Sequence, residues 1–208
     1  MSLFIRSKFC FAELFGRYRM NKKKVASSTR KQRARSLSSS TKRRHKVTRK
    51  YRLILAKRRR ARIKQLYADD VFSLTNKERV AAGLLPLQKL FITADLPNGE
   101  MLTTDQLNDI ATLKARDMRD NNYFSHTSPT YGSPGQMLTD FGVEWTAYGE
   151  NIAAGQLTPE AVMESWMNSP GHRANILNPN FTHLGVGYVP GNDQNDYKTY
   201  WAQLFVRL

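Results

Sequence analysis

Cysteine is almost absent from this chain, since Cys10 is the single one among 208 residues. One thiol excludes an intrachain disulfide framework, and it also excludes a metal cluster held by several cysteines. Long hydrophobic runs are missing too, because no stretch approaches the ~20 apolar residues that a membrane-spanning helix needs. The best candidate for a signal-peptide core, residues 9–16, is short, carries Glu13 and leads into Arg17 and Arg19. We therefore predict no clear signal peptide.

Acidic residues are scarce in the first third of the chain. Residues 1–67 contain 24 Lys and Arg against one acidic residue, whereas residues 68–208 contain 9 Lys and Arg against 16 Asp and Glu. The net charge of +16 therefore combines +23 with −7. So basic a segment, with few apolar residues, buries too little surface to offset its ordering entropy. We predict a basic, low-complexity and largely disordered extension over 1–67, with a helix over 51–67, and a folded domain over 68–208.

The charge of the extension predicts a polyanionic partner, such as nucleic acid, teichoic acid or anionic lipid. Basic residues cluster at 42–46 and 57–62. Tyr51 is the one aromatic residue between positions 21 and 66, so base stacking gives little basis for selectivity. The alternative is a solvated tail with no partner.

Helical patterns fill most of the folded part. Ser133, Thr158 and Ser169 each place a capping hydroxyl before a proline at the first helical position, a combination typical of helix starts. Thr104 is the expected cap of a further helix. Residues 91–101, with the turn sequence Pro97-Asn98-Gly99, are expected to form a loop. The predicted helices cover residues 71–82, 104–121, 134–141, 159–167 and 170–176.

Strand patterns appear near the C-terminus, at residues 184–189 and 199–208. In the second strand, even-numbered residues from Tyr200 to Val206 face one way, and Trp201, Gln203 and Phe205 face the other. Helices that precede paired strands predict the α+β class, with an antiparallel sheet covered by helices.

Three of the four histidines lie in the folded part, at His126, His172 and His183. His126 is in a predicted loop, His172 is in the first turn of a predicted helix, and Glu150 is in the sequence Gly-Glu-Asn. Two imidazoles and a carboxylate can hold a divalent metal or exchange protons. The residues alone leave open that both histidines cap loops and that Glu150 binds backbone N–H groups. His183, at a predicted strand edge, is expected to be structural or exposed.

Seven segments, in their order and spacing, resemble the CAP superfamily, also called the SCP/PR-1-like domain or cysteine-rich secretory protein family, in its bacterial form. The segments are residues 76–87, 115–118, 123–129, 148–153, 166–177, 185–188 and 200–205. The resemblance covers residues 75–208. It implies an α–β–α sandwich, in which an antiparallel sheet lies between helical layers.

The resemblance also implies a site. The family's cleft is lined by two histidines and acidic residues, which fall here on His126, Glu150 and His172, with the two histidines as metal ligands. The implied cofactor is a divalent metal such as zinc or calcium. The eukaryotic pattern has a second glutamate three residues after the helix tryptophan, Trp166, where this chain has Ser169.

Two functions are compatible with such a cleft. One is a binding module for a divalent metal, a lipid-like molecule or another small cell-surface ligand. The other is a metal-dependent or acid–base hydrolase, protease-like, that uses the same residues. A hydrolase needs a nucleophile or an activated water in reach, and Ser125 and Ser169 occupy turn and capping positions. We therefore expect binding, and the resemblance implies an extracellular or cell-surface location.

Overall fold

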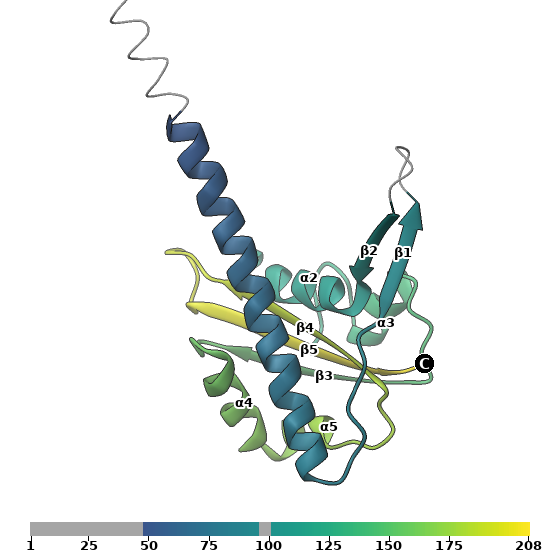
Figure 1. Ribbon diagram of the computed structural model, residues 1–208. Coiled ribbons are helices and arrows are strands. Elements are labelled where there is room, and N and C mark those ends of the chain that lie inside the picture. Colours follow the sequence, from purple (N-terminus) through teal and green to yellow (C-terminus); the bar gives the residue numbers. More distant parts are fainter. Residues whose placement is uncertain (1–47, 96–100) are drawn as a thin grey trace, which may run out of the picture. The chain divides into compact units, whose positions relative to one another are not determined.

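Figure 1 shows the computed structural model of the protein, which describes residues 48–95 and 101–208. The chain divides into two units, Met1–Arg58 and Arg59–Leu208. Residues 48–58 of the first unit are helical and exposed, and residues 59–81 of the second unit are helical as well. The second of these helical segments is followed by a turn at Gly83, whose positive φ of 76° suits a residue without a side chain. The helices predicted over 51–67 and 71–82 are thus present.

A three-stranded antiparallel sheet forms the centre of the second unit. Its strands are β3 (Ala147–Ala154), β4 (His183–Pro190) and β5 (Thr199–Arg207), in the order β3-β5-β4. The two predicted strands are confirmed as β4 and β5, whereas β3 was not predicted from the sequence. Every residue of β5 except the last is buried, because helices cover both faces of the sheet.

The two faces of β5 belong to two different hydrophobic clusters. Tyr200, Ala202, Leu204 and Val206 join one cluster, and Trp201 and Phe205 join the other. The predicted alternation along this strand is therefore confirmed.

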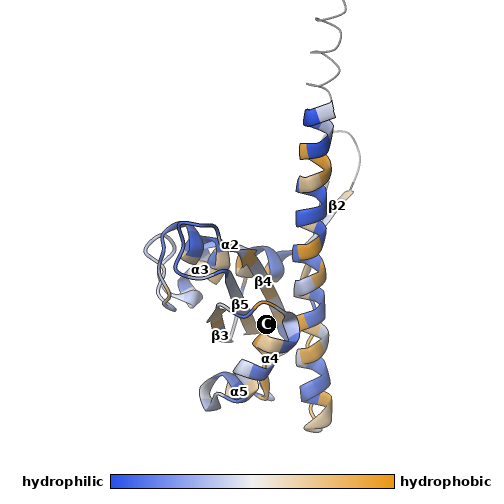
Figure 2. Ribbon diagram, turned by 90° about the vertical axis from the view of Figure 1, so that its left-hand side faces the viewer, coloured by the Kyte–Doolittle hydropathy of each residue, from blue (hydrophilic) through white to orange (hydrophobic). Residues whose placement is uncertain are grey.

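Helices α2 (Gln106–Asp120) and α3 (Pro134–Asp140) cover one face of the sheet. Helices α4 (Pro159–Met167) and α5 (Pro170–Ile176) cover the other, together with residues 59–81 (Figures 1 and 2). The predicted α–β–α sandwich is thus confirmed.

Two glycines of β4 allow α2 to lie directly on the sheet. A Cβ atom added to Gly185 would come within 2.3 Å of the backbone of Leu107, and one added to Gly187 within 2.2 Å of the backbone of Ala111. Real Cβ atoms do not approach other atoms so closely, so these positions require glycine.

Two of the three caps predicted before prolines are confirmed by hydrogen bonds. Ser133 accepts a hydrogen bond from the backbone N–H of Gln136, and Thr158 accepts one from that of Ala161. Ser169 precedes α5 but its side chain makes no capping hydrogen bond. The helix-starting proline is present in all three places, so the predicted helices form with or without the hydroxyl's contribution.

The loop predicted over 91–101 is wrong for the residues that the structure describes there. Strands β1 (Phe91–Asp95) and β2 (Met101–Asp105) pair antiparallel, and the Thr93 and Thr103 hydroxyls lie 3.3 Å apart across the pair. Phe91, Ile92 and Thr93 of β1 and the two threonines of β2 are aromatic or β-branched residues, which suit a strand. The turn sequence at 97–99 lies outside the described residues.

The cap predicted at Thr104 is wrong as well. Thr104 pairs with Ile92 in the β1–β2 ladder. Asp105 caps α2 instead, because its carboxylate accepts a hydrogen bond from the backbone N–H of Asn108.

The domain boundary predicted at residue 68 stays a prediction. The second unit begins earlier, at Arg59, and the ring of Tyr67 stacks on Trp201 with 5.9 Å between the ring centroids. None of the helices in the described part of the chain is both long and apolar enough to cross a membrane.

Candidate functional site

His126 and Glu150 form a direct contact. His126 lies in the loop between α2 and α3, Glu150 lies on the edge strand β3, and 2.7 Å separates the Nδ1 atom of the ring from the Oε1 atom of the carboxylate. The glutamate side chain is 3% exposed and that of the histidine is 56% exposed. Because an ionised carboxylate only accepts hydrogen bonds, Nδ1 carries the proton of the neutral ring, and the lone pair of Nε2 remains available to a ligand.

His172 belongs to the same region of the molecule. It lies in the first turn of α5, and its backbone carbonyl accepts a hydrogen bond from the side chain of Asn151, the neighbour of Glu150 on β3. Burial lowers the pKa of His172 below its usual value of 6.5, and the nearby His126 lowers it further. At pH 7 the imidazole of His172 is therefore mostly neutral, as a metal ligand must be.

Two buried polar atoms at this site have no hydrogen-bond partner within the described residues. They are Oε2 of Glu150 and Nδ1 of His172. Almost all buried polar atoms in folded proteins have a partner, so each of these atoms needs an explanation. A ligand with hydrogen-bonding groups would supply partners for both.

The structure does not place three metal-ligating side chains together. Across the described residues, no group of three His, Cys, Asp or Glu side chains could hold a metal ion. Glu150 faces the ring of His126, so the side chains left for direct coordination are the two imidazoles. Whether His126, Glu150 and His172 bind a ligand stays a prediction.

The loop of His126 is held by two charged side chains of α2 that sequence reasoning missed. Lys114 is 1% exposed and donates hydrogen bonds of 2.8 Å to the backbone carbonyls of Ser125 and His126. Asp117 is 7% exposed and accepts hydrogen bonds from four side chains, which belong to Asn121, Tyr123, Ser128 and Thr130. Burial alone would raise the pKa of Asp117, but these hydrogen bonds outweigh it and hold the pKa below the usual value.

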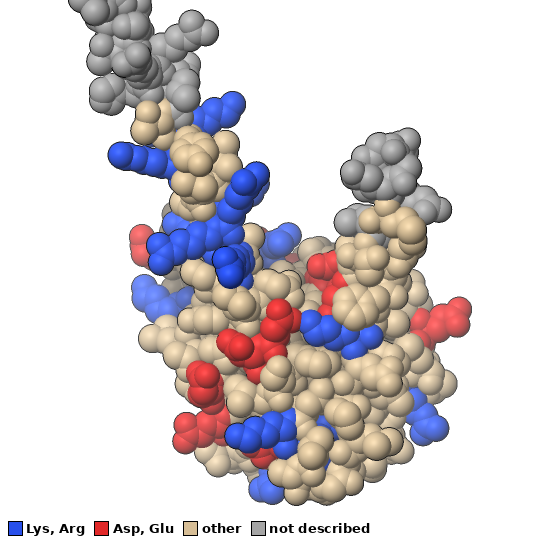
Figure 3. All heavy atoms as spheres, in the orientation of Figure 1, with Lys and Arg blue, Asp and Glu red and all other residues tan. Residues whose placement is uncertain are grey.

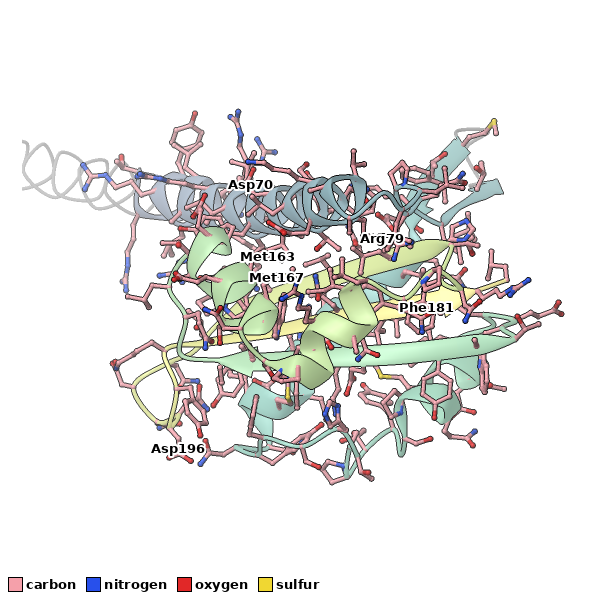
Figure 4. All side chains as sticks on the ribbon, turned by 90° about the horizontal axis from the view of Figure 1, so that it is seen from below. Asp70, Arg79, Met163, Met167, Phe181 and Asp196 are labelled. Carbon is pink, nitrogen blue, oxygen red and sulfur yellow. The ribbon has the colours of Figure 1, made fainter. Side chains whose placement is uncertain are left out.

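Helix α5, which carries His172, is held by a third buried charge. Arg79 is 1% exposed and donates hydrogen bonds to the backbone carbonyls of Leu85, Ile176 and Asn178. The carbonyl of Ile176 lies at the C-terminal end of α5, where a cation is favourable, and that of Asn178 lies just beyond this end. In Figure 4, Arg79 lies on the side of the helical segment 59–81 that faces the other elements.

A network of buried amides connects the same helix to the sheet. Asn175 of α5 donates to the carbonyl of Glu150 and to the side chain of Asn151. Asn151 in turn donates to Gln203 of β5, and Gln203 donates to Thr75. The network therefore runs from the site, through the sheet, to the helical segment 59–81.

The helical spacing of Lys114 and Arg79 could have indicated that these two charged residues are buried. Lys114 follows Leu107 by seven residues and so falls on the apolar face of α2, and Arg79 follows the buried Val71 by eight. Each is a charged residue at a position where the helical pattern expects an apolar one.

The other candidates behave mostly as expected. His183 begins β4, on the opposite side of β5 from Glu150, and its ring is hydrogen-bonded to the Thr182 hydroxyl at 2.9 Å. Ser125 accepts a hydrogen bond from the backbone N–H of Thr127, so it stabilises a turn. The Ser169 hydroxyl lacks the capping role that was expected of it.

An antiparallel sheet between two helical layers, with His, Glu and His gathered at one edge strand, is the architecture expected of the CAP class of domains. The model of the family described as CAP: Cysteine-rich secretory protein family matches residues 72–205. The chain therefore belongs to the CAP family.

Two curated relatives come from Bacillus subtilis (strain 168). The protein YkwD is 48% identical over 140 residues, which are 67% of this chain and 47% of YkwD. The membrane protein YlbC is 36% identical over 138 residues, which are 66% of this chain and 34% of YlbC. The chain thus spans less than half the length of either relative.

Solved structures agree on the fold. An extracellular protein containing a SCP domain, from Bacillus anthracis str. Ames, matches with a TM-score of 0.56 and 36% identity, over 70% of this chain and 42% of that one. An outer surface protein of Borrelia burgdorferi matches with a TM-score of 0.53 and 20% identity, over 65% of this chain and 88% of that one. The second likeness concerns the fold alone.

Proposed function

We propose that this protein is a binding module whose ligand site is formed by His126, Glu150 and His172. The observation that carries the proposal is the pair of buried, unpartnered atoms among the described residues, Oε2 of Glu150 and Nδ1 of His172, beside the exposed ring of His126. Oε2 accepts a hydrogen bond from a ligand hydroxyl, amine or metal-bound water. Small-molecule sites use a few such converging polar groups to orient what they bind.

A divalent metal fits the donor set, and zinc fits it better than calcium. Two imidazole nitrogens are ordinary zinc ligands, whereas calcium takes six to eight oxygen atoms. Glu150, bonded to Nδ1 of His126, fixes the ring in the manner of the carboxylates that support metal-bound histidines. With two protein ligands from His126 and His172, we expect weak binding. The bound ion would supply a Lewis acid and open coordination positions for a further ligand.

Catalysis finds less support than binding. A histidine that activates a nucleophile lies within hydrogen-bond reach of it. In the described part of the chain, no Ser, Thr or Cys side chain is hydrogen-bonded to the ring of His126, whose Nδ1 is bonded to Glu150. Nδ1 of His172 has no partner there at all. The hydrolase alternative would therefore need an activated water.

The proposed place of action is the cell surface or the extracellular space. Support comes from the Bacillus anthracis structure, which is described as an extracellular protein and is 36% identical to this chain. The description of that structure names no ligand. A lipid-like or other small cell-surface ligand is therefore our proposal alone.

The basic helix supports the proposal of a polyanionic partner, nucleic acid, teichoic acid or anionic lipid. Residues 48–67 contain 9 Lys and Arg and no Asp or Glu, and nearly all of these basic side chains are exposed. Figure 3 shows blue basic atoms along this segment. Phosphate neutralisation releases counterions, so such binding weakens steeply with salt.

The polyanion proposal is tested with a labelled DNA duplex and with anionic vesicles, at roughly 50 and 200 mM salt. The comparison variant replaces Lys57, Arg58, Arg59 and Arg60 with glutamine. We expect the wild type to bind at low salt and the variant to bind more weakly. Binding that ignores salt and the four substitutions contradicts the proposal.

The ligand site is tested by isothermal titration of the full chain with zinc and, separately, with calcium. We expect weak binding of zinc by the wild type, and loss of that heat in His126→Ala and in His172→Ala. His183→Ala is the matched control, because this histidine lies on the far edge strand, and it should bind as the wild type does. Equal heats in all four proteins would remove the metal from the proposal.

A further inference from the structure

The loop that presents His126 is held without apolar burial. Ser125, His126 and Thr127 are all exposed, so packing contributes little to their position. Nevertheless the ring of His126 meets the buried carboxylate of Glu150 at 2.7 Å. Some other interaction must therefore fix the backbone at this point.

Lys114 supplies that interaction. Its ammonium group has three N–H donors, and three acceptors surround it, the backbone carbonyls of Ser125 and His126 at 2.8 Å and the hydroxyl of Tyr123 at 3.2 Å. Its charge is buried, and within the described residues no carboxylate lies within salt-bridge distance of it. A buried charge is costly unless its hydrogen bonds are satisfied, so this group strongly favours the one loop conformation that satisfies it.

The electrostatic surroundings agree with this arrangement. Burial lowers the pKa of Lys114, and the nearby carboxylates of Glu150 and Asp117 partly offset that effect. The ammonium therefore lies close enough to Glu150 to interact with its charge. Lys114 thus contacts the backbone of one member of the His126–Glu150 pair and interacts electrostatically with the other.

We propose that Lys114 is a positioning residue for His126, which holds the loop so that Nδ1 donates to Glu150 and the Nε2 lone pair is presented to a ligand. A neutral histidine ring exists as two tautomers, and the hydrogen bond made by one nitrogen decides which nitrogen carries the proton. Without Lys114 the backbone at Ser125 and His126 loses its hydrogen bonds, although Asp117 still binds later residues of the loop. The contact with Glu150 is then no longer maintained, and the ring exchanges between both tautomers. The consequence for zinc rests on the proposed function, whereas the consequence for the tautomer does not.

The test is nitrogen-15 NMR of the histidine rings at neutral pH, which distinguishes the two tautomers. We expect the Nδ1–H form of His126 in the wild type and a mixture of both forms in Lys114→Met. Lys114→Gln, which keeps two of the three donors, should give an intermediate result and serves if the methionine variant does not fold. Where the wild type binds zinc, the affinity of Lys114→Met should fall about tenfold or more.

Arg79→Met is the matched control. It removes another buried cation that binds backbone carbonyls, but those carbonyls belong to Leu85, Ile176 and Asn178, none of which lies in the loop of His126. The tautomer of His126 should be unchanged in this variant. An unchanged tautomer in both Lys114 variants overturns the proposal. So does an equal change in Arg79→Met, since the effect would then reflect general destabilisation. A wild type that binds no zinc contradicts the proposed function and leaves this test intact.

Discussion

The two histidine-bearing segments are held in different ways. The loop of His126 accepts hydrogen bonds from Lys114 of the preceding helix, and the partners are 9 to 12 residues apart in the sequence. Helix α5, which carries His172, is bonded to Arg79 through hydrogen bonds that span 97 and 99 positions. One segment is fixed by local contacts and the other by long-range contacts.

The local anchor of the His126 loop and the long-range anchor of α5 should also differ in how easily each segment opens. A locally anchored, exposed loop can open while the sheet remains intact, so its opening free energy lies below that of global unfolding. Helix α5 cannot leave without breaking the buried hydrogen bond from Arg79 to Ile176 and the hydrogen bond from Asn175 to Asn151 of β3. We therefore expect the loop of His126 to open at a lower free energy than α5 does.

The largest effect is expected from the long-range anchor. Arg79→Met removes the donor of three backbone carbonyls, of which that of Ile176 is buried, and this costs about 3 kcal/mol of the free energy of unfolding. Urea denaturation of the full chain measures this loss. Lys77→Met, at an exposed position in the same helix, is the control and should change stability by less than about 0.5 kcal/mol. A similar small value for Arg79→Met would show that α5 does not depend on this contact.

A smaller effect, confined to one side of the site, is expected for Asp117→Asn. The amide retains one acceptor where the carboxylate serves four donors, so we expect a loss of about 2 kcal/mol. Amide hydrogen exchange should accelerate at residues 121–130 and stay unchanged in α5. Equal acceleration in both segments would contradict the separation of the two anchors.

The Asp117 carboxylate should make the stability of the His126 side of the site depend on pH. The pKa of Asp117 in the folded protein lies below its usual value of 3.8, because its hydrogen bonds favour the ionised form. The stabilisation is therefore present above about pH 3.8 and is lost as the pH falls through the lower folded pKa. Between roughly pH 5 and 2, the free energy of unfolding should fall more steeply with decreasing pH in the wild type than in Asp117→Asn. The same pH dependence in both proteins would show that the ionised Asp117 carboxylate does not stabilise the fold.

The helix caps offer a comparison between neighbouring helices. Thr158→Ala removes a capping hydrogen bond at the start of α4 and should cost about 1 kcal/mol. Ser169→Ala removes a hydroxyl that makes no such bond at the start of α5, so the change should be near zero. Thermal unfolding of both variants measures the difference, and equal losses would mean that Ser169 does cap α5 in solution.

The smallest effect tests the proximity of the two histidines. The pKa of His172 is lowered first by burial and then by His126, so His126→Gln should raise it only part of the way toward 6.5. Proton NMR titration of the His172 ring gives the value directly. An unchanged pKa would mean that the two rings do not interact.

Much of the fold follows from the sequence where local signals act alone. The proline-headed helices α3, α4 and α5 and the alternating strands β4 and β5 were all predicted. Strand β3 was missed because Gly149, Glu150 and Asn151 interrupt any alternation of apolar and polar residues. That interruption is explained by the site, since Glu150 faces His126 and Asn151 supports His172.

The hydrogen-bond partners of the anchoring residues could not be derived from local patterns. A lysine, arginine or aspartate in a helix is usually exposed, and the residue type alone does not indicate what it binds. The partners of Lys114, Asp117 and Arg79 are mostly backbone carbonyls or hydroxyls. Such partners carry no signal in the sequence, because every residue has a carbonyl group. The family resemblance brought His126, Glu150 and His172 together in advance, but it did not indicate what holds them.

The central claim, that His126 and His172 serve one ligand site, is tested most directly by crystals of the full chain soaked in zinc. Anomalous diffraction at the zinc edge locates the ion independently of any assumption about its ligands. The account predicts an anomalous peak in contact with both histidine rings, and it predicts that calcium soaks give none there. Zinc peaks confined to other surfaces, or a peak that contacts one ring while the other makes no contact, would contradict it.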